Sequence, residues 1–305
     1  MSGVSRRRFL TVAAGLGAAG ISGFARPVQS HSRVIWSGVA LGAKARIIVD
    51  TGDREQAADL VEACVAEVDR LESLFSLFRA DSAISRLNTR GWCQADGDFL
   101  QILSLADAVH RASGGAFDPT IQPLWAAFAE AQTERETVAD STGFDHVRYG
   151  PQGISFNRPG MALTLNGIAQ GYVTDRITAL FSAEGIRHVL VDIGELRALG
   201  PRRDGAGWPV RIAGSERVIT LGDRALATSA TLGTTIDRAG TVGHIIDPRS
   251  GRPVAANRQV TVSAPTAAVA DALSTAACVL AGGCVTDLVR AFEGARIEAR
   301  AGFGI

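Results

Sequence analysis

Two oxygen-bearing side chains near the C-terminus have the spacing of a divalent-cation site. Asp271 and Thr275 lie four residues apart in the segment 270–275, and residues four apart share one face of a helix. Carboxylate and hydroxyl oxygens are the hard ligands that Mg²⁺ prefers, and this ion needs few protein ligands where it also contacts phosphates. The same spacing suits a buried aspartate hydrogen-bonded to Thr275. Both interpretations stay open from the sequence.

Two glycine-containing turns offer backbone groups to a ligand. The segment 113–120 (SGGAFDPT) brings Asp118 to the start of a helix, where backbone amides can face a phosphate or a ring oxygen. Its glycine pair can instead end the preceding helix while Asp118 caps the next one. The segment 165–172 (LNGIAQGY) leads from a strand into a helix, and its two glycines allow the backbone to approach a ligand closely.

His244 is the candidate general base. It precedes an apolar pair and a tight turn in the segment 244–251 (HIIDPRSG). Histidine is the side chain whose ordinary pKa lies nearest neutral pH, so it suits proton transfer. A single histidine can equally be a structural residue with its hydrogen bonds satisfied.

The elements that must position these residues follow from the apolar pattern. Between 53 and 75 apolar residues recur every three or four positions, which predicts a long amphipathic helix. Further helices are predicted over 98–111, 119–129, 168–183, 266–280 and 284–292, and strands over 34–36, 45–49, 189–193, in short pieces over 145–165 and through most of 196–262. Because strands do not alternate strictly with helices, we expect an α+β fold. The expected unit is a single two-lobed domain over 33–305, with mixed or antiparallel sheets and flanking helices.

The composition excludes several classes of function. Basic and acidic residues balance at 31 each, whereas a nucleic-acid partner requires a basic excess or stripe. Lys44 is the only lysine, so no other lysine can serve as a nucleophile or as a phosphate-binding residue. The cysteines have no CxxC spacing, which argues against a zinc site; they are Cys64, Cys93, Cys278 and Cys284. We expect them to be buried, and a single disulfide of unknown pairing is the alternative.

The first thirty residues are typical of a twin-arginine export signal. Paired arginines and Phe-Leu at 5–10 precede an apolar run at 11–21, which is about half the length that spans a membrane. Small residues at 23–25 suit cleavage, and no nearby cysteine offers a lipid anchor, so a periplasmic location is expected. An uncleaved anchor or a chance basic start is the alternative. The GxGxxG match at 15–20 lies inside this leader rather than between a strand and a helix, so it predicts no dinucleotide site.

In their order and spacing these segments resemble the ApbE-type FAD:protein FMN transferases. The resemblance runs over about 34–293 and includes the segments 74–82 (LFSLFRADS), 84–88 (ISRLN) and 192–195 (DIGE). It implies Mg²⁺-dependent transfer of FMN from FAD, the substrate, to a threonine hydroxyl, with release of AMP. The implied partner is a flavin-acceptor protein carrying the target threonine, such as a membrane-bound electron-transfer protein. The leader and the NGIAQGY sequence resemble the branch that serves nitrous-oxide-reductase maturation.

The resemblance also implies residue roles. Mg²⁺ would be held by the Gly167 carbonyl, the Asp271 carboxylate and the Thr275 hydroxyl, and His244 would act with Asp271 in catalysis by activating the acceptor threonine. The implied flavin contacts are Leu41, Phe78, Ala116, Phe117, Asp118, Asn166, Gln170 and Ile246.

The sequence departs from the family pattern at four positions. Leu41 and Phe78 stand where methionine and tyrosine are common, Gln170 replaces the usual lysine, and Gly194 stands alone where a glycine pair is common. Two alternative functions stay open: water can replace threonine at the same metal site, and loss of the lysine charge at Gln170 makes a protein without catalysis credible. One is a FAD pyrophosphatase that releases FMN and AMP, and the other is a non-catalytic periplasmic flavin-binding protein.

Overall fold

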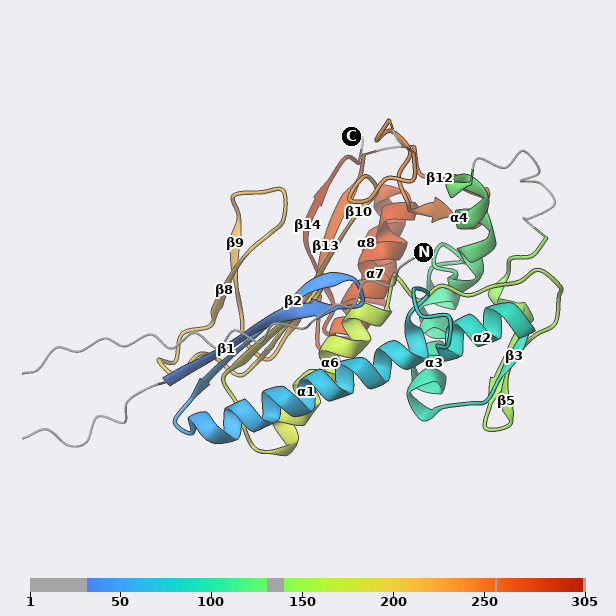
Figure 1. Cartoon of the computed structure of the whole chain (residues 1–305). Helices are drawn as coiled ribbons and strands as arrows, with labels where there is room; N and C mark the ends of the chain where they lie inside the picture. The colour runs from blue at the N-terminus through green and yellow to red at the C-terminus, as the bar shows by residue number, and fades with distance from the viewer. Residues whose placement is uncertain (1–31, 131–139, 238, 256, 304–305) are drawn as a thin grey trace, which may run out of the picture.

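The protein is represented by a computed structural model that describes residues 32–130, 140–237, 239–255 and 257–303. The predicted export signal at 1–30 lies outside the described residues. Within the described ranges, no helix is both long and apolar enough to cross a membrane. Figure 1 shows a large twisted sheet, helices packed along it, and a second group of helices around a small sheet.

The main sheet has seven strands in the order β1-β2-β6-β7-β10-β13-β14, and all its neighbouring strands are antiparallel. Its strands are β1 (Ser32–Ala40), β2 (Ala43–Thr51), β6 (Val189–Ile193), β7 (Leu196–Leu199), β10 (Ala225–Ala230), β13 (Gln259–Ala264) and β14 (Arg296–Ala301). The smaller sheets comprise β3 (Trp92–Cys93), β4 (Val147–Gly150) and β5 (Gly153–Phe156); β8 (Trp208–Arg211) and β9 (Val218–Leu221); and β11 (Ile246–Asp247) and β12 (Arg252–Pro253).

The helices lie mainly on one face of the main sheet. They are α1 (Arg54–Phe75), α2 (Ala83–Arg90), α3 (Gly97–Ala112), α4 (Gln122–Ala129), α6 (Ala169–Ala183), α7 (Ala267–Val279) and α8 (Gly282–Arg290), with 3₁₀ turns η1 (Pro119–Ile121) and η2 (Phe144–His146). Helices α6 and α7 pack side by side against the sheet, α1 crosses α6, and α3 contacts α7 (Figure 1). The pair α6–α7 therefore lies at the centre of the fold.

Alternating residues of β2 separate two hydrophobic cores. Ile47 and Val49 belong to the large core beneath the helices, whereas Ile48 packs with Trp208 and Leu221 of the β8–β9 hairpin. Successive side chains of a strand point to opposite faces of a sheet, so the hairpin covers the face that lacks the helices.

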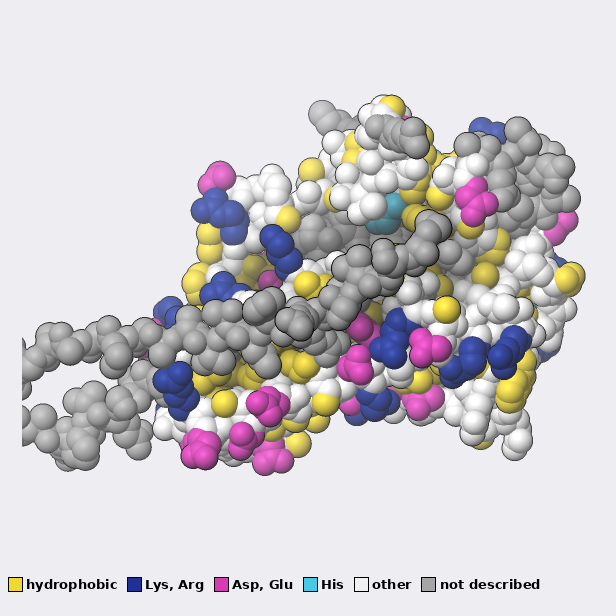
Figure 2. Space-filling view, viewed as in Figure 1, with side chains coloured by type: hydrophobic (Ala, Val, Ile, Leu, Met, Phe, Trp, Pro, Cys, Tyr) yellow, Lys and Arg dark blue, Asp and Glu magenta, His cyan; other side chains and the backbone are white. Residues whose placement is uncertain are grey.

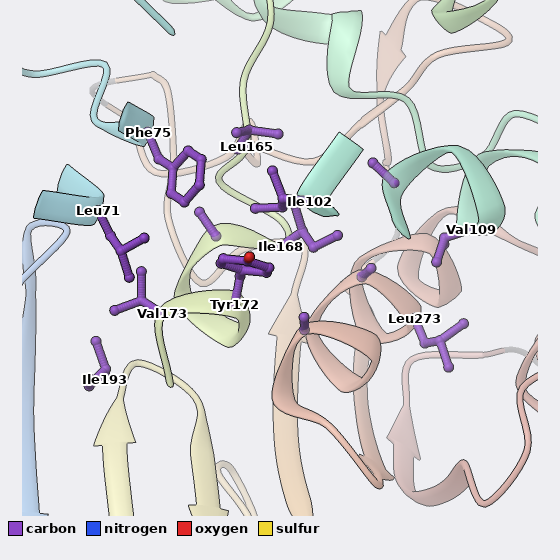
Figure 3. Close-up of a cluster of buried hydrophobic side chains, with 14 of the residues drawn as sticks. Leu71, Phe75, Ile102, Val109, Leu165, Ile168, Tyr172, Val173, Ile193 and Leu273 are labelled. Atoms are coloured by element: carbon purple, nitrogen blue, oxygen red, sulfur yellow. The ribbon is translucent and has the colours of Figure 1, made fainter. Parts of the chain in front are cut away.

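The local sequence of α1 explains why this segment forms a helix. The Asp53 carboxylate accepts a hydrogen bond from the Gln56 backbone N at 3.0 Å and caps the first turn. Six residues then alternate in spacings of four and three along one buried stripe: Ala57, Val61, Cys64, Val68, Leu71 and Phe75. Such a stripe seats a helix on a core. Figure 3 shows Leu71 and Phe75 facing Tyr172 and Val173 of α6.

Helices α6 and α7 approach each other closely because α6 carries a glycine at the crossing. A Cβ added to Gly171 would lie 2.4 Å from the Ala267 carbonyl oxygen. Gly171→Ala is therefore expected to destabilise the protein by about 1–3 kcal/mol, because backbone must move to admit the methyl group. A lowered midpoint of thermal unfolding would show this. Gly283→Ala is the matched control, since that glycine has open space around it on α8. Equal melting temperatures for the two variants would contradict the packing argument.

The α+β prediction is confirmed, and the sheets formed by the described strands are antiparallel rather than mixed. The predicted strand pieces over 145–165 are wrong beyond Phe156. There the Leu163 backbone bonds with the Asn88 side chain instead of a neighbouring strand, at 2.7 Å for its N–H and 2.8 Å for its carbonyl. Helix α2 and strand β14 were not predicted.

The four cysteines are free, so the alternative of a disulfide among them is wrong for this structure. Cys64, Cys93 and Cys278 are buried as expected, whereas Cys284 is exposed at the start of α8. Burial raises the pKa of Cys64 and of Cys278 to about 12. Both thiols therefore stay protonated and unreactive at neutral pH.

Candidate active site

Three separate segments meet at Gly167. A Cβ added there would lie 3.0 Å from Thr275 Cγ2, 3.2 Å from Thr275 Oγ1 and 3.3 Å from Phe117 Cε2. The turn before α6, the middle of α7 and the glycine-rich turn after α3 therefore converge on one point. Because a methyl group would crowd both neighbours, glycine is the residue that allows this approach.

Asp271 is held against the start of α6. Its side chain is buried, with the residue 3% exposed, and its Oδ2 accepts a hydrogen bond from the Gly171 backbone N at 3.1 Å. Burial raises the pKa of Asp271 to about 7, while the Gly171 bond acts in the opposite direction. Thr275 Oγ1 lies 3.1 Å from Ser229 Oγ of β10. The structure therefore gives Asp271 and Thr275 different partners, and the sequence-level alternative of a bond between them is wrong.

The chemistry of these donors fits Mg²⁺. Asp271, Thr275 and the Gly167 carbonyl offer a carboxylate, a hydroxyl and a carbonyl oxygen, which are hard ligands of the kind that this ion binds. No cluster of three or more His, Cys, Asp or Glu side chains suited to a metal occurs within the described ranges. A site with one carboxylate leaves coordination positions for water and phosphate oxygens, as Mg²⁺ sites that bind nucleotides require.

Glu195 is a second buried acid near Asp271, and it was not predicted as a site residue. The residue is 8% exposed and lies between β6 and β7. Burial raises its pKa well above the ordinary value, and the carboxyl groups of Asp271 and Asp192 act in the same direction. An acidic residue two positions after the apolar strand 189–193 was the available signal. Its raised pKa favours the neutral, protonated carboxyl group beside Asp271.

Gln170 packs against the turn that carries the single glycine. A Cβ added to Gly194 would lie 2.7 Å from Gln170 Cδ, and Gly194 has a φ of +86°. This left-handed backbone favours glycine. The Gln170 amide therefore lies beside the DIGE turn, in the same region as the Gly167 and Asp271 contacts.

The glycine-rich turn at 113–120 is held in place by hydrogen bonds to side chains within it and close to it. Asp118 Oδ1 accepts hydrogen bonds from Thr120 N at 2.8 Å and from Thr120 Oγ1 at 2.6 Å, and Oδ2 accepts one from Phe144 N at 3.2 Å. Asp118 thus caps η1, which confirms the structural interpretation of its carboxylate. His110 Nδ1 lies 2.8 Å from the Phe117 carbonyl oxygen. Ala116 and Phe117 are buried, at 3% and 5% exposure, and the flavin contacts implied at 116–118 stay predictions.

His244 has a defined tautomer. Its Nδ1 lies 2.9 Å from the Thr234 carbonyl oxygen, and its backbone N donates to the same oxygen at 3.1 Å. A carbonyl oxygen can only accept, so Nδ1 carries the hydrogen and Nε2 keeps a lone pair in the neutral ring. Burial lowers the pKa of His244, which favours this neutral form at pH 7. Neighbouring Ile246 is buried in β11.

Arg258 joins the C-terminal end of α7 to Thr231, the residue after β10. Its Nη1 donates to the carbonyl oxygens of Cys278, Val279 and Leu280 at 3.0–3.2 Å, and so caps the C-terminal end of α7. Its backbone N donates to Thr231 Oγ1 at 2.9 Å. No local pattern predicts this role of Arg258, because its contacts depend on pairing between distant segments.

Leu41 and Phe78 form a separate group at the tip of the β1–β2 hairpin. Leu41 has a φ of +48°, which is rare for a residue with a side chain, and its N–H donates to Glu72 Oε1 at 2.8 Å. Phe78 is 85% exposed, and a Cβ added to Gly42 would lie 3.9 Å from its Cε2 atom. A large apolar ring left in solvent beside a fixed turn is a candidate ligand contact. Asn166 is also exposed.

On the face of the molecule drawn in Figure 2, acidic and basic side chains are both present. Figure 2 shows acidic side chains gathered over the N-terminal part of α1, where Asp53, Glu55, Asp59 and Glu62 are exposed. Basic side chains on this face lie singly or in small groups among acidic ones. Among the described residues, this face therefore carries no basic stripe of the kind that tracks a nucleic-acid backbone.

Comparison with known proteins finds relatives named FAD:protein FMN transferase that match most of the chain. The FAD:protein FMN transferase of Escherichia coli K12 is 26% identical over 317 aligned positions, covering 94% of this chain and 90% of that protein. The protein of that name from Vibrio cholerae is 31% identical, covering 65% of this chain and 66% of its own length.

Solved structures share the fold. The ApbE protein of Thermotoga maritima superposes with a TM-score of 0.77 at 26% identity, covering 89% of this chain and 97% of its own. The flavin transferase ApbE of Vibrio cholerae gives a TM-score of 0.76 at 24% identity, covering 88% and 93% of the two chains. The ApbE family model matches residues 41–299. With the match extending over nearly all of the folded part, this chain belongs to the ApbE family.

Proposed function

We propose that this protein transfers FMN from FAD to a threonine hydroxyl of an acceptor protein, with Mg²⁺ as cofactor and AMP as the second product. The relatives named FAD:protein FMN transferase support the reaction. The observation that carries the proposal is the convergence of Gly167, Thr275 and Phe117, with Asp271 fixed one turn of α7 away. This arrangement places hard oxygen donors beside an aromatic ring and a glycine turn.

The reaction is a phosphoryl transfer. The threonine oxygen attacks the phosphorus on the FMN side of the pyrophosphate, and the bond from that phosphorus to the bridging oxygen breaks. A phosphoester to threonine forms, and AMP leaves with the bridging oxygen. Bound Mg²⁺ would supply charge neutralisation at the pyrophosphate oxygens, held by Asp271, Thr275 and the Gly167 carbonyl.

His244 supplies the base in this proposal. Its Nε2 lone pair accepts the threonine proton, while the Thr234 carbonyl keeps Nδ1 protonated and stabilises the imidazolium that forms. The remaining proposed residues bind FAD, namely Leu41, Phe78, Ala116, Phe117, Asp118, Asn166, Gln170 and Ile246. Among these, Gln170 offers an amide rather than a charge.

The test of the function is intact-mass analysis of an acceptor protein incubated with this chain, FAD and Mg²⁺. The expected result is an acceptor heavier by FMN minus one water, with the addition mapped to a threonine. The first acceptors to try are membrane-bound electron-transfer proteins linked to nitrous-oxide-reductase maturation. Production of free FMN and AMP with an unlabelled acceptor would instead identify a pyrophosphatase. FAD that stays intact throughout would identify a flavin-binding protein.

Phe78→Ala is expected to raise the dissociation constant for FAD about tenfold, because an aromatic contact with a flavin ring is lost. The melting temperature should stay unchanged, since the ring is 85% exposed and packs against little. Fluorescence quenching of FAD measures the binding. Val218→Ala is the control, as Val218 is exposed on β9. Unchanged FAD binding in Phe78→Ala would remove this residue from the proposed site.

We also propose that residues 1–30 direct export through the twin-arginine route and that 33–305 form the catalytic domain in the periplasm. The paired arginines and the short apolar run support this. Cell fractionation of the full chain tests it, with replacement of Arg6 and Arg7 by lysine as the comparison. Equal periplasmic amounts of both forms would contradict the proposal.

A further inference from the structure

Helices α6 and α7 are joined by two reciprocal links. Gly171 of α6 donates its N–H to the Asp271 carboxylate of α7 at 3.1 Å. Four residues further along α6, the Asp175 carboxylate accepts from the first two N–H groups of α7, Ala267 N at 2.8 Å and Ala268 N at 2.9 Å. Asp175 of α6 thus bonds to α7, and Asp271 of α7 bonds to α6. On each helix the two linked positions lie four residues, or about one turn, apart.

Asp175 supplies a cap that α7 lacks in its own sequence. Thr266 occupies the N-cap position but makes no side-chain capping bond, and the first turn of α7 contains no acidic residue. The four N–H groups at a helix start need partners from elsewhere. A carboxylate from the neighbouring helix fills this need and fixes where α7 begins relative to α6.

Arg197 keeps this carboxylate in place. Its Nη1 pairs with Asp175 Oδ1 from strand β7, and the Asp175 side chain is 15% exposed. An acid in so little water is stabilised when a guanidinium and two backbone N–H groups share its charge. The sheet, α6 and α7 are therefore joined at a single side chain.

We propose that Asp175 is a positioning residue for the cation site: by capping α7 from α6 it sets how far α7 is rotated and shifted along its axis, and so where Asp271 meets Gly171 and Thr275 meets Gly167. This inference rests on the proposed function, since it assumes that those donors bind a divalent cation. Asp175 itself does not bind the cation in this proposal. Its effect passes through the first turn of α7, because Asp271 follows Ala267 by four residues.

Mn²⁺ binding measures the effect without catalysis. Electron paramagnetic resonance of free Mn²⁺ gives the dissociation constant for the full-length protein, its Asp175→Ala and Asp175→Asn variants, and Asp271→Asn. Asp175→Ala is expected to bind Mn²⁺ about tenfold to a hundredfold more weakly, the usual effect of removing a group that orients metal ligands. Asp175→Asn keeps one acceptor oxygen, so its loss should be smaller but measurable.

Asp53→Ala is the matched control. It removes a carboxylate that caps α1, whose capping oxygen lies 3.0 Å from Gln56 N, and should lower the melting temperature without changing Mn²⁺ affinity. Excess Mg²⁺ should restore FMN transfer in Asp175→Ala but not in Asp271→Asn, because only the second variant loses a ligand. If Asp175→Ala does not fold, Asp175→Asn decides the question.

The outcomes distinguish failure of the positioning role of Asp175 from failure of the cation site itself. Wild-type Mn²⁺ affinity in the folded Asp175 variants, with weak binding in Asp271→Asn, would overturn the positioning role alone. Wild-type affinity in Asp271→Asn, or no Mn²⁺ binding by the unmodified protein, would overturn the cation site and the positioning role together.

Discussion

Asp271→Asn is expected to reduce FMN transfer about 10²- to 10³-fold or more, because it removes the one carboxylate among the proposed Mg²⁺ donors. Asparagine keeps the shape of the side chain and an oxygen that can accept from Gly171 N. It also removes the need to bury a charge at a residue that is 3% exposed. The variant should therefore fold with a melting temperature at least equal to that of the parent. Single-turnover labelling of an acceptor measures the loss.

The control for this variant is Asp287→Asn. Asp287 lies on the exposed face of α8, the helix that follows α7. Its replacement makes the same chemical change without touching the proposed site, and transfer should proceed at the parental rate. Parental activity in Asp271→Asn would show that the reaction needs no cation at this carboxylate.

His244→Asn is expected to slow FMN transfer about 10²- to 10⁴-fold while FAD still binds, because the acceptor proton loses its base. An asparagine amide can still donate to the Thr234 carbonyl, so the local fold should survive. His188→Asn is the matched control. His188 Nδ1 lies 2.6 Å from the Pro201 carbonyl oxygen, in the same kind of contact, and asparagine tolerates its φ of +68°.

The pH dependence provides a second measure of the same role. A base must be neutral to accept a proton, and burial lowers the pKa of His244 from 6.5. The midpoint of the acid limb in the transfer rate should therefore lie below pH 6.5. With Mg²⁺ saturating, so that Asp271 stays ionised, His244→Asn should lack the acid limb. A variant that keeps the limb, or that loses FAD binding, would identify His244 as structural.

The sequence predicted those elements whose burial follows from local spacing. Helix α1 buries one stripe from Ala57 to Phe75, and such a stripe is visible as apolar periodicity. Helix α2 buries only Ala83, Ile84 and Leu87 within eight residues, too few for a periodic signal. Strand β14 was missed for a related reason. It is a six-residue edge strand that alternates charged and apolar residues, and none of its residues is fully buried.

The residues of the proposed site could be named from the sequence, but the contacts that support them could not. The spacing of Asp271 and Thr275 and the glycine before α6 are sequence features that the structure brings together. The bond from Gly171 to Asp271 spans 100 residues, and the Asp175 cap on α7 spans 92 or more. Such links depend on which helices become neighbours, which no local pattern encodes.

The supporting residues clarify how the fold positions the chemistry. Helix α7 is held at its start by Asp175 and at its end by Arg258. Opposite charges at the two ends also suit the helix dipole, since an anion lies at the N-terminus and a cation at the C-terminus. The helix that carries both proposed side-chain ligands of the cation is thus held at both ends by charged side chains from other elements.

The central claim is that Asp271, Thr275 and the Gly167 carbonyl hold a divalent cation beside the pyrophosphate of FAD. A crystal structure of the protein grown with FAD and Mn²⁺ tests this most directly, because Mn²⁺ gives an anomalous signal that locates it without assumption. The prediction is a single strong peak in contact with those three oxygen donors and with phosphate oxygens of FAD. Bound FAD with the Mn²⁺ peak elsewhere, or with no peak at all, would contradict the claim.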